Sequence, residues 1–444
     1  MMVVKTVGKA TGIAPRPVFV AGRSAPDRPA LRFSGSRVPW LSGLLACLMV
    51  QFSGAAEISP MTRVSPGPRI VNGLATTDWP TAVSLVDSVS RTNTCGGVLV
   101  DCQTVLTAAH CVCDLDGASC QPGNDTGLSF TPGSLEIFFQ NAPPVSAQSV
   151  QIPEYYDFAV RGDVALLTLA TAVDGLRPTP INTAQAPAFA TQGIKVGFGP
   201  TTSAGTDSGI KRSGAVSLSS CENSAFVPQE EHLCWDFAGL GNAGAPGEDS
   251  NTCGGDSGGP MFVDLGGGPV VAGITSGGSG DCEAPDASFD ADVFANRAWL
   301  EARINPPAGG ICGTLTPVGD TGTSVFAAGG NLDANTTEGR HTFTVEPGTV
   351  RLRVALNGDK NLDLNLSVRP MGGAALCATV LEGSFEFCDL SGPVPGTWEA
   401  VVTRFSGSAG EYQLVSTLFG TGTGSGGEVV FRDGFETVPG VDVQ

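Results

Sequence analysis

The chain has 444 residues, more than one ordinary domain needs, and 41% of them are hydrophobic, which is enough to form cores. It carries 43 acidic against 24 basic residues, a net charge of −19, so nucleic acid is excluded as an expected partner because phosphate contacts need a basic face. The 61 glycines and the low charged fraction, 15%, favour short strands joined by turns over a helical protein.

Residues 1–56 have the features of a secretory signal peptide. A long basic region precedes the apolar stretch "VPWLSGLLACLMVQFSGAA" at 38–56, which ends in small residues. We expect cleavage near Ala56, a secreted location, extracellular or periplasmic, and no stable membrane insertion afterwards. Because the basic region is unusually long, a start site further downstream is one alternative, and a lipoprotein box ending at Cys47 is another.

A short segment at 57–69, rich in Pro and Ser, ends at Arg69 and is too short to form a core. From Ile70 to about Ile304 the chain consists of short apolar strings such as "GGVLVD", "VALLTLA" and "VVAGITS", separated by turn residues. Strands of this length and spacing predict a barrel or a sandwich. The window "DVFANRAWLEARI" at 292–304 lacks Gly and Pro and has apolar residues near helical spacing, which predicts a helix.

The rest of the chain predicts a second module. Adjacent prolines and glycines at 305–315 indicate a linker. Strings such as "VRLRVAL" and "LDLNLSV" at 316–420 alternate apolar and polar side chains, which is typical of half-buried antiparallel strands and predicts a separate β-sandwich. A Gly-rich tail follows at 421–444.

The stretch "TCGGDSGGPMF" at 252–262 raises the question of whether Ser257 is a nucleophile, because a hydroxyl needs a base to activate it. The chain has three histidines: His110 in "TVLTAAHC", His232 in a polar loop, and His341 at the start of a strand in the second module. Taken alone, a histidine beside a cysteine is more often structural, and Asp163 before a buried run is more often a turn residue.

Together, "TAAHC", "GDVALL" and "GDSGGP" occur in this order, flanked by "RIVNG" and "ITSGG". Over Ile70 to Ile304 this set resembles the trypsin-like (chymotrypsin-fold) serine endopeptidases. The resemblance implies an all-β fold of two antiparallel β-barrels with a C-terminal helix. "GDSGG" also fits the G-x-S-x-G pattern of α/β-hydrolases, but here a strand-like segment follows the serine and the downstream histidine lies in another module.

The resemblance assigns roles to five residues. His110 would take the proton from Ser257, Asp163 would hold the imidazole, and Ser276 would lie near the buried Asp163 beside the specificity pocket. The N–H groups of Gly255 and Ser257 would form the oxyanion hole. Substrates would be proteins or peptides, with no cofactor and no metal. The alternative function is a catalytically silent adhesion or binding protein on a protease fold.

The resemblance also implies activation by cleavage. A protease would cut between Arg69 and Ile70, and the new α-amino group would pair with Asp256, ordering the oxyanion turn. Segment 57–69 would then be an activation peptide. The alternative is a leader with no gating role.

The specificity pocket departs from trypsin. Asn251, six residues before the nucleophile, stands where trypsins have an Asp that pairs with Lys or Arg, and Gly278 would keep the pocket entrance open. Asp286 would lie near another wall, where it could still favour a basic side chain. The alternative for Asp286 is an exposed acidic loop.

Export places the cysteines in an oxidising compartment, and the absence of any C-x-x-C pair argues against a zinc site. The disulfides implied by the resemblance, together with a local bridge in the second module, are Cys95–Cys111, Cys221–Cys234, Cys253–Cys282 and Cys377–Cys388. For the remaining four cysteines we expect Cys113–Cys120 and Cys102–Cys312.

The second module resembles the bacterial pre-peptidase C-terminal domain through "HTFTVEPGTVRLRVALNGDKNLDLNLSV" and "PGTWEAVVTRFSGSAGEYQLVS". Asp359 and Asp363 fit either a calcium site or solvated turns.

Overall fold

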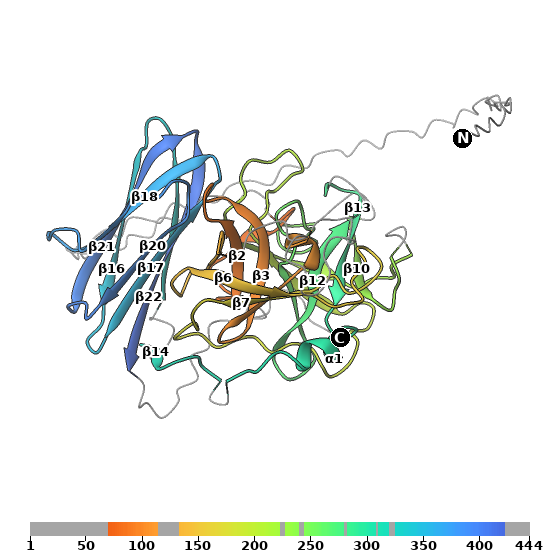
Figure 1. The fold of residues 1–444 in the computed structure, drawn as a ribbon. Coiled ribbons are helices and arrows are strands. Elements are labelled where there is room, and N and C mark those ends of the chain that lie inside the picture. Colours follow the sequence, from red (N-terminus) through yellow and green to blue (C-terminus); the bar gives the residue numbers. More distant parts are fainter. Residues whose placement is uncertain are drawn as a thin grey trace, which may run out of the picture. The chain divides into compact units, whose positions relative to one another are not determined.

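A computed structural model describes residues 70–113, 133–222, 227–238, 244–278, 282–307, 310–318 and 325–421 of the chain, and these residues belong to one compact unit. Within them the fold is all-β (Figure 1), as the turn-rich sequence predicted. The described residues contain no helix that is both long and apolar enough to cross a membrane. The predicted signal peptide, Arg69, Cys120 and the tail at 422–444 lie outside the described residues.

The first six long strands close into a barrel in the order β2-β3-β4-β7-β6-β5. Their inward side chains, among them Leu85, Leu99 and Leu167, form one core cluster. The bounds are Ala82–Asp87 (β2), Asn93–Asp101 (β3), Thr104–Thr107 (β4), Leu135–Phe138 (β5), Val145–Gln151 (β6) and Ala165–Leu169 (β7). Closure pairs every strand edge, so the barrel gives the loops at its ends a rigid base.

The second half of the region forms a seven-stranded antiparallel sheet in the order β1-β9-β8-β11-β12-β13-β10. Two antiparallel barrels were expected, and the structure supports this in part: the second is a half-barrel, a sheet whose only described link between β9 and β10 is an isolated bridge between Ser219, just after β9, and Cys234 of β10. The bounds are Leu74–Ala75 (β1), Gln192–Gly197 (β8), Arg212–Ser217 (β9), His232–Phe237 (β10), Pro260–Asp264 (β11), Pro269–Gly278 (β12) and Asp286–Asp292 (β13).

The predicted C-terminal helix is much shorter than the window 292–304. Helix α1 spans Arg297–Glu301, five residues. Asp292 belongs instead to β13, where it pairs with Gly273, and its carboxylate accepts the backbone N–H of Phe294. Strand pairing thus overrides the local helical pattern at the start of the window.

Residues 315–318 and 325–421 form what we call the C-terminal module, coloured from teal to blue in Figure 1 and drawn there as two layers of strands. One sheet has the order β14-β22-β17-β20, with β15 also paired to β22, and the other has the order β16-β21-β18-β19. Side chains of both sheets, such as Leu356 and Leu366, share one core cluster. The bounds are Leu315–Pro317 (β14), Val325–Leu332 (β15), Glu338–Val345 (β16), Arg351–Gly358 (β17), Leu362–Pro370 (β18), Cys377–Thr379 (β19), Glu386–Ser391 (β20), Gly396–Gly407 (β21) and Gly410–Thr421 (β22).

Candidate active site

The side chains of His110 and Asp163 meet at one end of the closed barrel. A 3-10 turn, Ala109–Cys111, directly follows β4 and carries His110, whereas Asp163 lies just before β7, the strand that pairs with β4. Nδ1 of His110 lies 2.8 Å from Oδ2 of Asp163, and Oδ1 of Asp163 accepts the backbone N–H of His110 at 2.9 Å. The Ser276 hydroxyl donates to the same carboxylate at 2.5 Å.

These contacts shift the pKa values of His110 and Asp163. Burial opposes ionisation of His110, but the neighbouring Asp163 carboxylate outweighs it, so the pKa of His110 is raised above its usual value. Asp163 is completely buried, which alone would raise its pKa, but His110 and the Ser276 hydroxyl hold that pKa below the ordinary value. Asp163 is therefore a carboxylate that can stabilise a positively charged imidazole.

Ser257 lies in a tight turn that packs against the strand end leading to His110. The Ser257 carbonyl accepts the N–H of Gly96 at 2.7 Å. Gly258 has φ +77°, and a Cβ there would lie 2.2 Å from Oγ1 of Thr107. Only glycine permits this approach, which places the half-buried Ser257 close to the His110 turn. Among the described residues no hydrogen bond joins the Ser257 hydroxyl to His110; in substrate-free sites this contact often tightens only with substrate.

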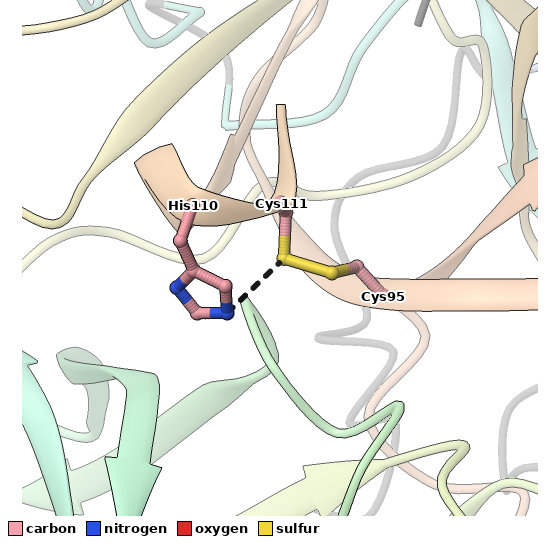
Figure 2. A group of neighbouring side chains, drawn as sticks. All are labelled: Cys95, His110 and Cys111. Carbon is pink, nitrogen blue, oxygen red and sulfur yellow. Dashed lines mark hydrogen bonds between the residues drawn. A yellow bond between two sulfur atoms is a disulfide. The ribbon is translucent and has the colours of Figure 1, made fainter. Parts of the chain in front are cut away.

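A disulfide between Cys95 and Cys111 anchors the His110 turn to β3 (Figure 2). Sγ of Cys111 lies 3.9 Å from Nε2 of His110, the dashed contact in Figure 2. The three side chains are close enough to hold a metal ion, but both sulfur atoms are already bonded to each other, so neither is a thiolate ligand. The disulfide therefore holds the backbone turn that carries His110 in place.

Asp256, the residue before Ser257, is buried beneath the turn. Its carboxylate accepts the backbone N–H groups of Gly199 at 2.7 Å and Cys253 at 2.9 Å. Burial raises the pKa of Asp256 to about 6, although these N–H groups act in the opposite direction. Ile70 is also fully buried, and the next residue, Val71, accepts the backbone N–H of Asn251 at 3.0 Å.

The predicted pocket residues Asn251, Gly278 and Asp286 come together. The side-chain amide of Asn251, which is completely buried, donates to Oδ2 of Asp286 at 2.8 Å and to the carbonyl of Cys282 at 3.2 Å. Its oxygen accepts the Ser288 hydroxyl at 2.6 Å. Gly278 pairs with Ser288 across β12 and β13. Asp286 is half-buried and bonded to Asn251. Ser276, two residues before Gly278 in β12, instead donates its hydroxyl to Asp163.

Sequence reasoning missed a buried ion pair behind the turn. Nζ of Lys195 donates to both carboxylate oxygens of Asp290 and to the Thr275 hydroxyl, at 2.7–2.8 Å. Burial lowers the pKa of Lys195 and raises that of Asp290. The Thr275 carbonyl in turn accepts the N–H of Gly258 at 2.8 Å. A lysine at an inward position of the apolar string "IKVGFG" is the signal that could have found this pair.

Two further side chains contact the site. The Asn93 amide donates to the carbonyl of Gly255 at 3.0 Å, and Phe158 packs edge-on against the His110 ring at a centroid distance of 5.4 Å. Gly255 has φ +99°, which suits a turn whose N–H groups must point to one spot. Neither Asn93 nor Phe158 lies in a recognisable motif.

The described disulfides pair the same cysteines that were expected: Cys95–Cys111, Cys102–Cys312, Cys221–Cys234, Cys253–Cys282 and Cys377–Cys388. Cys113 is also disulfide-bonded, and its expected partner, Cys120, lies outside the described residues. In the C-terminal module the carboxylate of Asp359 accepts the backbone N–H of Glu411 at 2.8 Å, and Asp363 accepts the Ser406 hydroxyl at 3.4 Å.

A closed antiparallel barrel beside an open one, with an Asp–His pair next to a glycine-rich serine turn, defines the class of serine hydrolases built on β-barrels. The chain matches the Trypsin family over residues 70–300, and it belongs to that family. It is 34% identical to a protein named "Trypsin-like protease" from Streptomyces glaucescens, over 45% of this chain and 72% of the relative.

Two further relatives also have names of the trypsin and chymotrypsin kind. A "Chymotrypsin" from Phaedon cochleariae is 28% identical over 54% of this chain and 83% of the relative. A "Trypsin alpha" from Drosophila erecta is 28% identical over 53% of this chain and 88% of the relative. The chain is thus a serine endopeptidase of the trypsin family that acts on proteins or peptides, as predicted.

Proposed function

We propose that Ser257, His110 and Asp163 form the catalytic triad. The observation that carries this is the chain of contacts from Ser276 to Asp163 to Nδ1 of His110, next to the Ser257 turn. With Nδ1–H donated to Asp163, Nε2 is the nitrogen that accepts the Ser257 proton as Oγ attacks the scissile carbonyl. The N–H groups of Gly255 and Ser257 would hold the developing oxyanion, and His110 would then protonate the leaving amine.

The pocket supports a preference for a basic side chain before the scissile bond. Asn251 is neutral, but its amide holds the Asp286 carboxylate by a hydrogen bond, which places one negative charge beside the position that trypsins use. The carboxylate would pair with Lys or Arg of the substrate from this neighbouring wall. We propose this preference in place of an exposed acidic loop, because Asp286 is half-buried.

Export and activation complete the proposal. The signal sequence at 1–56 and the disulfides fit a secreted protein. Cleavage after Arg69 would free the α-amino group of Ile70. The Ile70 side chain is buried, and the next residue, Val71, pairs with Asn251. The new amino group would form an ion pair with the Asp256 carboxylate. We assign the C-terminal module, with its two sheets around one core, to the β-sandwich class of pre-peptidase C-terminal domains.

The test uses the full chain after cleavage at Arg69, treated with a fluorophosphonate probe. Labelling of the wild type but not of Ser257→Ala, together with hydrolysis of a peptide substrate, is the expected result. A correctly cleaved, folded protein that is neither labelled nor active would overturn the triad and favour a silent binding protein. Ser220→Ala, a serine outside the site, is a matched control that should be labelled like the wild type.

A further inference from the structure

The C-terminal module contacts the protease region through buried polar groups. Side chains of Asn357 and Gln413 on the module bond to Gln140 and to the backbone at Lys211. Asn357 is completely buried, and Phe385 of the module packs edge-on against Phe138 at a centroid distance of 4.9 Å. Buried polar groups bonded in this way cost free energy if the contact opens, so the contact has one defined geometry.

A first route runs from this contact to Asp256. Nδ2 of Asn357 donates to the carbonyl of Gly209 at 2.7 Å, and the backbone N–H of Lys360 donates to the carbonyl of Ser208 at 2.8 Å. The N–H of Gly209 in turn donates to the carbonyl of Phe198 at 2.8 Å. The next residue, Gly199, gives its N–H to the Asp256 carboxylate.

Gly209 shows how close this approach is. A Cβ on Gly209 would lie 2.1 Å from the carbonyl oxygen of Gly358, and Gly209 has φ +110°. Backbone therefore meets backbone at this point, which only glycine permits. The loop that supplies Gly199 to the active site is thus fixed at its far end by the module.

A second route runs to Gly255. Nη2 of Arg91 donates to the carbonyl of Phe385 at 2.8 Å, and Arg91 also forms an ion pair with Glu136. Arg91 is buried at the turn before β3, and two residues later the Asn93 amide holds the carbonyl of Gly255. The two routes therefore end on the two residues that precede Ser257.

We propose that the C-terminal module is a positioning element of the active site, acting through Asn357 and the backbone N–H of Lys360, which order the loop that holds Asp256 and hence the oxyanion turn. This inference rests on the proposed triad. It predicts that weakening the contact lowers turnover and leaves substrate binding largely unchanged, because the oxyanion hole acts mainly in the transition state.

Lys360 offers a matched pair of variants in the full chain. The bond from the Leu362 N–H to the Asp359 carbonyl closes a turn, and Lys360 is its second residue, a position that accepts proline. Lys360→Pro removes both the lysine side chain and the N–H that reaches Ser208, whereas Lys360→Ala removes the side chain and keeps the N–H. Asn357→Ala removes the bond to Gly209 together with those to Gln140 and Gln413, and Asn365→Ala on the solvent side of β18 is its control.

Each variant is cleaved after Arg69 and assayed for kcat, KM and the rate of fluorophosphonate labelling, well below its unfolding temperature. We expect kcat and labelling to fall together by about tenfold in Asn357→Ala and Lys360→Pro, with KM within about twofold and both controls like the wild type. If Asn357→Ala does not fold, Lys360→Pro decides alone.

Two different failures are distinguishable. A wild type that neither labels nor turns over contradicts the proposed triad. An active wild type whose two interface variants keep wild-type kcat, even with a lower unfolding temperature, shows that the contact only stabilises the fold and overturns the positioning role.

Discussion

Removing the charge of Asp286 tests the proposed specificity pocket most directly. Asp286 accepts the Asn251 amide at 2.8 Å. For a substrate ammonium or guanidinium paired with this carboxylate we take a charge separation of about 4 Å. At that separation the attraction is about 4 kcal/mol with an effective dielectric constant of about 20. Desolvation of both groups offsets roughly half of it, which leaves about 2 kcal/mol.

Asp286→Asn should therefore lower kcat/KM about 30-fold for peptides with Arg or Lys before the scissile bond. The same variant should leave a matched Leu peptide within about twofold, because the pocket keeps its size. The double variant Asn251→Asp/Asp286→Asn returns one carboxylate to the neighbouring position and should recover much of the preference for the basic peptides.

The assay is steady-state hydrolysis of two peptide series that differ only in this one residue. An Arg-to-Leu ratio that stays the same in Asp286→Asn would refute the reasoning, since the carboxylate would then not face the substrate. A ratio that falls in the single variant but does not recover in the double variant would mean that the position of the charge matters as well as its presence.

Four further outcomes are expected. Because His110 must be neutral to act as a base and its pKa is raised, the fall of kcat/KM on the acid side of its pH profile should have its midpoint above pH 6.5. Replacing Asp163 by Asn should lower kcat about 10⁴-fold in the same assay. Before activation, lowering the pH from about 6 towards 3.8 should raise the urea-unfolding stability of the wild type by about 3 kcal/mol more than that of Asp256→Asn, because folded Asp256 takes up its proton at a higher pH than the unfolded chain does. Asp290 and Asp292, whose pKa values burial also raises to about 6, contribute alike to both proteins and cancel in this difference. The cleaved wild type should lose the extra rise, and equal pH slopes in the wild type and Asp256→Asn would contradict the reasoning. Replacing both Cys102 and Cys312 by Ser should remove up to about 5 kcal/mol of stability, since that disulfide closes a loop of 210 residues, and an unchanged urea midpoint would argue against it.

The sequence could predict those parts of the site that depend on local patterns. The short motifs around His110, Asp163 and Ser257 consist of residues adjacent in the sequence, so they are recognisable without the fold. The pairing of Asn251 with Asp286 is different, because it depends on the register of β12 against β13, which shifts between Thr275 and Gly277. An irregularity of that kind leaves no signal in the sequence, so the sequence left two alternatives for Asp286.

Long-range contacts set the limit of sequence reasoning for the fold as well. The start of the predicted helix became the end of β13, because pairing with β12 is stronger than the helical tendency of "DVFANRAWLEARI". Lys195 meets Asp290 across 95 positions, and Asn357 meets Gly209 across 148. Each of these side chains looks ordinary in its own segment, and only the packed structure gives it a partner.

The contact between Asn357 and Gly209 can form only late in synthesis of the chain. The chain is synthesised from its N-terminus, so Ser257 leaves the ribosome a hundred residues before Asn357. If the module orders the oxyanion turn, an unfinished or truncated chain carries the nucleophile without a competent site. The cell that makes this protease would then be protected from partial products by the order of translation, and the proposed cleavage at Arg69 would add a second control.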